Sequence, residues 1–223
     1  MPKVKIPRQS THVDMTAMCD VAFLLLTFFI LATKIKPQEP VEVRTPASTS
    51  TMPIPDDYML LTMSKDGKVY YSVDNLNARE SIIQYISENK GLNLNASQIK
   101  AFKEAGSVGV PFNQLASYLS LSVADRNKFD KQAPGIPVDT TGNFDTNELA
   151  YWVRATRINN PNLRIAIKAD GESAYPYMKN VIGTLGKLKI FRFNFITESK
   201  GVPPGSALDM EIKSGKSTAA AAE

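Results

Sequence analysis

One acidic residue, Asp20, lies inside the most apolar stretch of the chain, Met15–Thr33. Apart from the terminal Thr33, the other polar side chains of this stretch are those of Thr16, Cys19 and Thr27. A carboxylate at the centre of a membrane helix costs about 2.5–3.5 kcal/mol even on the lenient insertion scale. Such a residue normally faces a protein partner or a water-filled path. Asp20 therefore predicts a site that binds and releases a proton.

The helical wheel places three polar residues on one face of this stretch. At about 100° per residue, Thr16 and Thr27 lie on the same side as Asp20. A simple lipid anchor has no need of such a polar face, which favours a carboxylate that works within a helix bundle. Two other interpretations are a signal anchor that tolerates an off-centre Asp and a buried helix of a soluble protein. At about 1.5 Å per residue the stretch crosses most of a bilayer core of about 30 Å, so we predict a membrane span at residues 13–33.

The charges around this span predict its orientation. Lys3, Lys5 and Arg8 precede it without an acidic residue up to position 13. By the positive-inside rule, residues 1–12 form a cytoplasmic tail and the C-terminal part lies across the membrane. The apolar run is too long for a cleavable signal peptide, and no small-x-small cleavage site follows it. We expect a single-pass protein with an uncleaved anchor.

The composition of the 223 residues excludes several functions. The net charge is +4, with no basic block interleaved with aromatic residues, so nucleic acid is not an expected partner. A single Cys and a single His exclude a disulfide framework and argue against zinc. Outside the membrane, no set of residues has the pattern of a catalytic site. We therefore expect no enzymatic activity, metal or cofactor.

A proline-rich linker follows the span at residues 34–57, with prolines at 37, 40, 46, 53 and 55. This composition favours extended backbone over a packed core. Within it, residues 41–43 alternate as a short strand does. We predict that Val41, Val43 and Pro46 belong to a segment that pairs with the edge of a folded domain, of the same or of a second subunit.

The remaining chain predicts one α+β domain at residues 58–213 and a disordered tail at residues 214–223. A hairpin at 58–63 and 69–73 turns through Asp66-Gly67. The last predicted unit is a strand at 163–169, a helix at 173–189 and a strand at 191–197, which should form a right-handed parallel pair. The other predicted elements are a helix capped by Asn77 and Glu80 that ends near Gly91, helices at about 95–105 and 111–121, a loop at 135–142, a helix capped by Asp145 and Glu148 that ends before Pro161, and a peripheral strand at 208–212.

Two features of this domain have competing interpretations. Trp152 and the phenylalanines 191, 193 and 195 could form a ligand platform, but their helix and strand periodicity favours packing in the core and on a sheet face. Asp170-Gly171 ends a strand, a position where active residues often lie. Because no base, nucleophile or phosphate-binding loop accompanies it, we interpret it as the turn that begins the next helix.

The chain resembles the ExbD/TolR family of energy-transducing membrane proteins. Four segments carry the resemblance, over about two thirds of the chain: Thr16–Val21, Thr45–Thr51, Ile165–Asp170 and Tyr175–Leu185. The first is similar to the family's membrane motif around its single acidic residue, and the third to its strand ending in a basic residue, Ala and Asp. The chain has Ala17 where the family usually has Pro, and residues 74–142 look like an insertion in the periplasmic domain.

The resemblance implies a function and partners. Family members work as dimers whose membrane helices sit inside a ring of ExbB or TolQ, and whose periplasmic domains act on TonB or TolA. It implies that protonation of Asp20 couples the proton motive force of the inner membrane to TonB-dependent outer-membrane transport. The alternatives are a TolR-like or stator-like anchor of a Tol or motility system, and a membrane-anchored binding protein in which Asp20 is incidental.

Overall fold

The structure is a computed structural model that describes residues 15–32, 41–49, 57–139, 143, 146–202, 204–207 and 209–210. It divides into two units, Met1–Pro37 and Gln38–Glu223. The first unit contains α1 (Met15–Ala32), an 18-residue helix without a buried residue. It is long and apolar enough to span a membrane, as predicted. The predicted tails at 1–12 and 214–223 lie outside the described residues.

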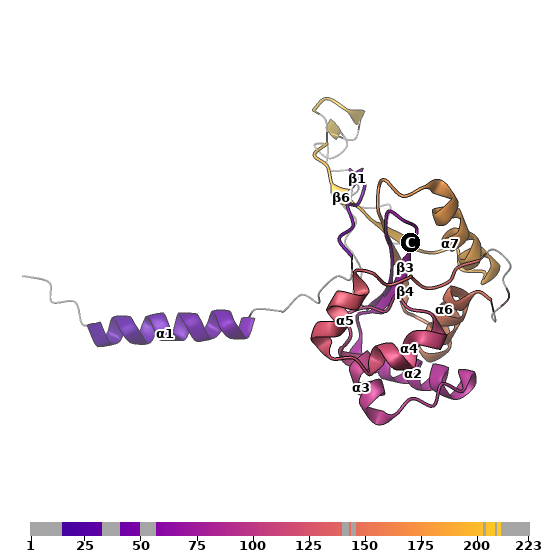
Figure 1. Ribbon diagram of the computed structural model, residues 1–223. Helices are drawn as coiled ribbons and strands as arrows, with labels where there is room; N and C mark the ends of the chain where they lie inside the picture. Colours follow the sequence, from indigo (N-terminus) through magenta and orange to yellow (C-terminus); the bar gives the residue numbers. More distant parts are fainter. Residues whose placement is uncertain are drawn as a thin grey trace, which may run out of the picture. The chain divides into compact units, whose positions relative to one another are not determined.

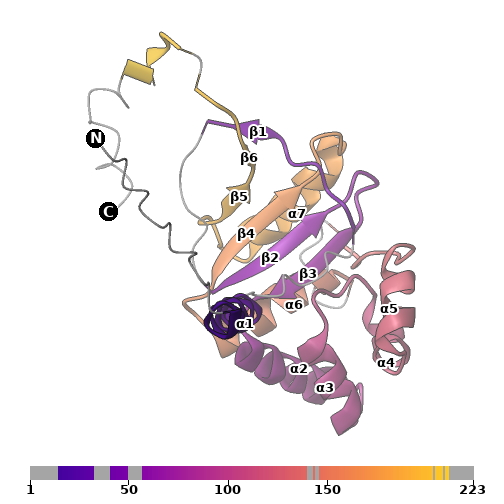
Figure 2. The ribbon, with the colours of Figure 1, turned by 90° about the vertical axis from the view of Figure 1, so that its left-hand side faces the viewer.

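The second unit is built around a four-stranded sheet with the order β3-β2-β4-β5. Its strands are β2 (Tyr58–Met63), β3 (Val69–Val73), β4 (Arg164–Ala169) and β5 (Asn194–Ile196). The hairpin β2–β3 is antiparallel, whereas β2–β4 and β4–β5 are parallel, so both predicted pairings are confirmed. Figures 1 and 2 show α6 (Glu148–Asn159) and α7 (Tyr175–Lys187) on the same side of this sheet.

The β2–β3 turn depends on one glycine. Gly67 has φ +78°, in the left-handed region that favours glycine. A Cβ at this position would also lie 2.4 Å from Cγ of Tyr177, a residue of α7. The Asp66-Gly67 signal therefore marks a turn and also a close approach to a helix that is distant in sequence.

Residues 74–142 form four helices, one more than predicted. They are α2 (Leu76–Lys90), α3 (Ala96–Glu104), α4 (Phe112–Leu119) and α5 (Val123–Asp130). The predicted caps Asn95 and Gly91 are confirmed: Asn95 forms a capping box with Gln98, and Gly91 ends α2 with φ +63°. The predicted cap Asn77 is wrong, because Asn75 accepts the backbone N–H groups of residues 77 and 78.

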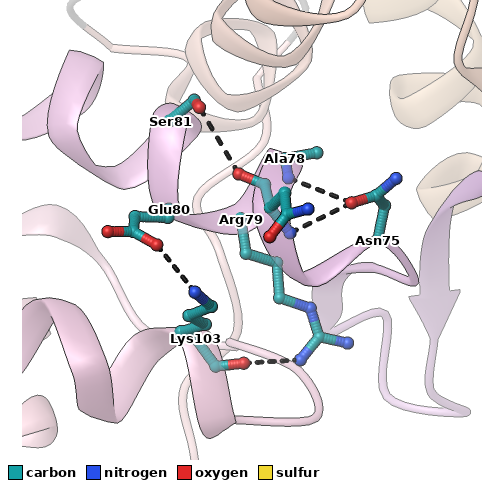
Figure 3. Close-up of polar contacts among 7 residues, drawn as sticks. Asn75, Ala78, Arg79, Glu80, Ser81 and Lys103 are labelled. Carbon is teal, nitrogen blue, oxygen red and sulfur yellow. Dashed lines mark hydrogen bonds and ion pairs between the residues drawn. The ribbon is translucent and has the colours of Figure 1, made fainter.

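Polar contacts join α2 to α3 and to the end of β3. Arg79 of α2 is buried, and its guanidinium donates to the carbonyl oxygens of Val73, Lys103 and Ala105. Figure 3 shows the bond to Lys103. Glu80 forms an ion pair of 2.7 Å with the Lys103 side chain. A buried guanidinium with several acceptors is a stable way to fix two helices to a strand end. Residues 74–142, predicted as an insertion, are thus tied to the sheet and share its core.

Trp152 lies at the centre of the hydrophobic core. It is fully buried, with its ring 5.7 Å from that of Phe102, 5.3 Å from that of Phe112 and 4.7 Å from that of Tyr71. Its predicted core role is confirmed, and two of these partners, Phe102 and Phe112, come from residues 74–142. Residues from the predicted insertion therefore complete the core under the sheet.

The C-terminal part differs most from the prediction. Phe191 and Phe195 are 77% and 49% exposed, so the predicted packing of these two side chains is wrong. The reason is that β5 is the edge strand of the sheet and begins only at Asn194. Asn147 rather than Asp145 caps α6, and Asp145 itself lies outside the described residues. The predicted strand at 208–212 is contradicted in its described part, where Asp209 and Met210 are helical.

Candidate functional site

Asp20 is the only charged residue of α1. Thr27 lies seven residues further along, or about 10 Å along the helix axis. Its hydroxyl donates to the carbonyl oxygen of Leu24 at 2.9 Å, so its proton is engaged within the helix and its oxygen can only accept. The two side chains are too far apart for a direct hydrogen bond. A proton path along this face needs groups from water or from other helices.

The side chains of α1 have no core of their own. Every residue is exposed except Thr27, which is half-buried. Phe23, Phe28 and Phe29 are each more than 60% exposed. An apolar helix of this length needs lipid or other helices around it. Within its own unit, α1 therefore offers no packed surroundings for the Asp20 side chain.

The linker segment 41–49 lies against the domain of its own chain. Within it, β1 (Ala47–Ser48) pairs in parallel with β6 (Glu198–Ser199), as Figure 1 shows. Pro46 O accepts the Glu198 N–H at 3.1 Å, and Ser48 O accepts the N–H of residue 200 at 2.8 Å. We call residues 41–49 the docked segment.

The valines predicted for strand pairing have a different part in this contact. The strand expected at residues 41–43 forms four to six positions later, in β1. Val43 is buried at 8% exposure, and Val41 packs at the edge of the core. These positions contribute side-chain burial, while Pro46 and the two residues of β1 contribute the backbone pairing. The alternation of apolar residues indicated burial correctly and misplaced the ladder.

Asp170 holds the start of the docked segment. Its Oδ2 accepts the Arg44 N–H at 3.1 Å, its Oδ1 accepts the Glu172 N–H at 2.9 Å, and Gly171 N–H donates to Arg44 O at 2.9 Å. The hydrogen bonds from Glu172 and then Arg44 hold the pKa of Asp170 below its ordinary value. Sequence reasoning identified the turn and missed this contact. The only available signal was the position of Asp170 at the carboxyl end of a parallel strand.

An ion pair between Lys65 and Glu172 lies beside Asp170, at the carboxyl end of β4. Lys65, in the β2–β3 turn, lies 2.7 Å from Glu172, and both side chains are about two-thirds exposed. The hydrogen bond that Lys65 donates to the Glu172 carboxylate raises the pKa of Lys65. Exposed pairs of this kind contribute little to stability. Among these three side chains, Asp170 therefore links the docked segment to the domain, while Lys65 and Glu172 form a solvated pair beside it.

Among the described residues, no group of three or more His, Cys, Asp or Glu side chains could hold a metal ion. The candidate functional features are instead Asp20 in α1 and the docked segment, which binds the linker to the domain that follows it. Both features fall within the comparison that matches. The sequence model of the family described as "Biopolymer transport protein ExbD/TolR" matches residues 7–200. The match covers α1 with Asp20, the docked segment and all four strands of the sheet.

Comparisons with curated proteins and with solved structures gave no match. The family match covers most of the chain and therefore shows the family. Its members are accessory subunits of energy transduction in biopolymer transport rather than enzymes, and they generally work with ExbB or TolQ and with TonB or TolA. The chain belongs to the ExbD/TolR family of biopolymer transport proteins.

Proposed function

We propose that this chain is the proton-carrying subunit of an inner-membrane complex of the ExbB–ExbD type, which couples the proton motive force to TonB-dependent outer-membrane transport. One observation carries the proposal: Asp20 is the single charged residue of an apolar, membrane-length helix that has no buried residue. Its partners are a multi-span ExbB/TolQ-like ring, a second copy of this chain and a TonB-like protein. The ring supplies the polar surroundings that a charged Asp20 requires.

The carboxylate works by alternating between two protonation states. The neutral acid crosses a low-dielectric region at much lower cost than the anion. Access from one aqueous side loads the proton, and access from the other releases it. Each charge moved across the membrane yields about 2.3 kcal/mol per 100 mV, which can drive the rotation or displacement of a helix. Thr16 and Thr27 line the same face and accept hydrogen bonds from water or from ring residues.

The docked segment connects this motion to the domain. Nine residue steps separate Ala32 at the end of α1 from Val41 at the start of the docked segment, a reach of at most about 30 Å. When α1 is displaced and the linker becomes taut, tension therefore acts on the contact between Arg44 and Asp170 before the rest of the domain moves. Release of residues 41–49 would lengthen the tether. This makes the docked segment the element through which the membrane helix controls the reach of the domain.

The topology follows from the charges around α1. Residues 1–12 are cytoplasmic, residues 34–57 form a periplasmic linker and residues 58–213 form the periplasmic domain. Lys3, Lys5 and Arg8 support this orientation, although Lys34 and Lys36 follow on the other side. A long C-terminal domain crosses largely regardless of such charges.

A TolR-like subunit or stator-like anchor is the second candidate, because the matched family contains both ExbD and TolR. Both would retain an acidic membrane helix, so Asp20 does not separate them. They differ in the protein that the domain acts upon, TonB or TolA. The full chain can be purified from its own membranes with its bound partners. Identifying the ring subunit and whether the co-purified partner is TonB-like or TolA-like distinguishes the two candidates.

The test of proton carriage compares two substitutions of one residue. Asp20→Asn keeps size and hydrogen bonding and cannot titrate, so it should co-purify with the ring and abolish TonB-dependent uptake. Asp20→Glu keeps titration and should retain part of the uptake. Thr27→Val, on the same face, removes a hydroxyl that does not titrate and should therefore reduce uptake less than Asp20→Asn. Normal uptake by the Asn variant would leave only an anchoring role.

A further inference from the structure

A basic pocket lies at the ends of two helices that the proposed mechanism does not use. It is an open pocket of about 650 Å³, formed by the last turns of α6, the turn before β4 and the segment after α7. Its lining residues are Arg154, Arg157, Pro161, Leu188, Lys189, Ile190, Phe191 and Arg192. The volume suits a small ligand or the headgroup of a larger one.

The pocket is strongly cationic. Four of its lining residues are Arg or Lys, and among the described residues that line it none is acidic. Between positions 151 and 192 the sequence has eight basic and two acidic residues. Those two acids, Asp170 and Glu172, contact Arg44 N–H and Lys65 at the other end of β4. The positive charge at the pocket is therefore not neutralised by these carboxylates.

Arg157 and Lys189 each have an unfavourable feature that the fold does not require. Arg157 donates to Pro161 O, yet its buried Nε has no hydrogen-bond partner among the described residues. Lys189 has φ +58°, and its N–H donates to Gly186 O at 3.0 Å. It thus occupies the left-handed position after a helix end, where glycine is the usual residue. A lysine in this conformation is strained. Stability alone would favour glycine or asparagine there, which indicates that the cation has another use.

Apolar side chains stand beside these cations. Phe191, which lines the pocket, is 77% exposed. Leu188 and Ile190 are half-buried in the pocket wall. Exposed aromatic and aliphatic groups next to Lys and Arg are typical of surfaces that bind anionic membrane interfaces.

We propose that the basic pocket binds the headgroups of anionic phospholipids. Arg and Lys recognise phosphate oxygens, while Phe191 contacts the adjoining acyl region. An acidic peptide offers similar charge, but the membrane is the anionic surface to which the chain is itself tethered. The nine residue steps after α1 keep Val41, the start of the docked segment, within about 30 Å of the helix end, so the tether holds the domain near the bilayer and raises the effective concentration of lipid. Headgroup binding would hold the domain at the membrane while the segment is docked.

The test uses the full chain in nanodiscs and its single tryptophan, Trp152, which lies in the same helix as Arg154 and Arg157. Energy transfer from Trp152 to dansyl headgroups is compared in phosphatidylcholine nanodiscs with and without phosphatidylglycerol. We expect transfer to rise with phosphatidylglycerol. The double variant Lys189→Asn/Arg192→Gln should lower the bound-to-free ratio about twenty-fivefold, at about fivefold per removed cation. Asparagine suits the left-handed backbone of position 189, which guards against misfolding.

The matched control is Lys179→Gln, an exposed cation of α7 that does not line the pocket. It should leave the transfer unchanged, and thermal unfolding should be equal for all variants. Transfer indifferent to phosphatidylglycerol, or an equal loss in the control, would overturn the proposal. Loss of transfer on adding millimolar inorganic phosphate would indicate a free-anion site instead. Loss with a short Glu- and Phe-containing peptide at lower concentration than phosphate would indicate a peptide site instead.

Discussion

Asp170→Ala should release the docked segment from its domain. The substitution removes the carboxylate that accepts Arg44 N–H at 3.1 Å and leaves the bond from Gly171 N–H to Arg44 O in place. The pairing of Pro46 O with Glu198 N–H, at 3.1 Å, is also retained. Docking is therefore weakened rather than abolished, and the effect can be measured.

The magnitude follows from the kind of bond that is lost. Hydrogen bonds to charged groups contribute about 1.5–3 kcal/mol, and because Asp170 is half-buried the lower end applies. A loss of about 1.5 kcal/mol lowers the docking equilibrium roughly tenfold. Asp170→Asn keeps a neutral acceptor and should lose about half as much free energy, or roughly a threefold effect.

Hydrogen exchange of the Arg44 amide in the full chain measures this equilibrium. Glu172→Gln is the control, because it breaks the exposed ion pair with Lys65 and leaves the contact with Arg44 intact. Protection of Arg44 should fall about tenfold in Asp170→Ala and stay unchanged in Glu172→Gln. Equal protection in wild type and Asp170→Ala, or equal losses in the two variants, would refute the assignment of Asp170.

The same contact predicts a dependence on pH. The folded-state pKa of Asp170 is lowered, so its contribution is present above the pKa of the unfolded or undocked state. It is lost as pH falls through the lower folded-state value, that is, below the ordinary aspartate pKa of about 3.9. Arg44 protection, corrected for intrinsic exchange, should be constant at neutral pH and fall only in this acidic range in the wild type. The fall should be absent in Asp170→Asn.

Three further predictions concern the linker, the core and the topology. Arg44→Pro removes the N–H that Asp170 accepts and should undock the segment more than Val43→Pro, because Val43 contributes burial and the backbone pairing of the segment lies elsewhere; cross-linking between cysteines on residues 48 and 199 measures this. Tyr118→Phe removes the hydroxyl that donates to buried Asp130 at 2.8 Å and should lower the free energy of unfolding by about 1–3 kcal/mol in thermal or denaturant melts, while Tyr175→Phe at an exposed position should not. Protease added to spheroplasts should remove the C-terminal domain and leave residues 1–33 protected, whereas a protected domain would contradict the proposed topology.

Local signals in the sequence predicted the elements that depend on local chemistry. The Asp66-Gly67 turn, the Asn95–Gln98 capping box and the Gly91 helix end are each fixed by residues a few positions apart. The same reasoning missed α5, whose Ser122 cap precedes a segment with weak apolar periodicity. It also chose Asn77 over Asn75, because both positions offer the same side chain and only the backbone conformation decides between them.

Contacts between distant residues could not be predicted in this way. Arg44 and Asp170 lie 126 positions apart, and no sequence pattern around either residue predicts a contact with the other. The cations of the basic pocket come from two helix ends separated by a strand and a helix, so in the sequence they look scattered. Phe195 alternates as a core strand residue does, yet it is exposed because β5 lies at the sheet edge. By contrast, Asp20 is evident from sequence because a charge inside an apolar run needs no tertiary context.

The central claim is that Asp20 carries protons, and proton flux tests it most directly. The full chain is co-purified with its ring partner, reconstituted in proteoliposomes, and exposed to a potassium diffusion potential while a trapped pH dye is followed. We expect potential-driven flux with wild type, reduced flux with Asp20→Glu and only the background leak with Asp20→Asn, at equal amounts of assembled complex. Wild-type flux from the assembled Asp20→Asn complex would contradict it.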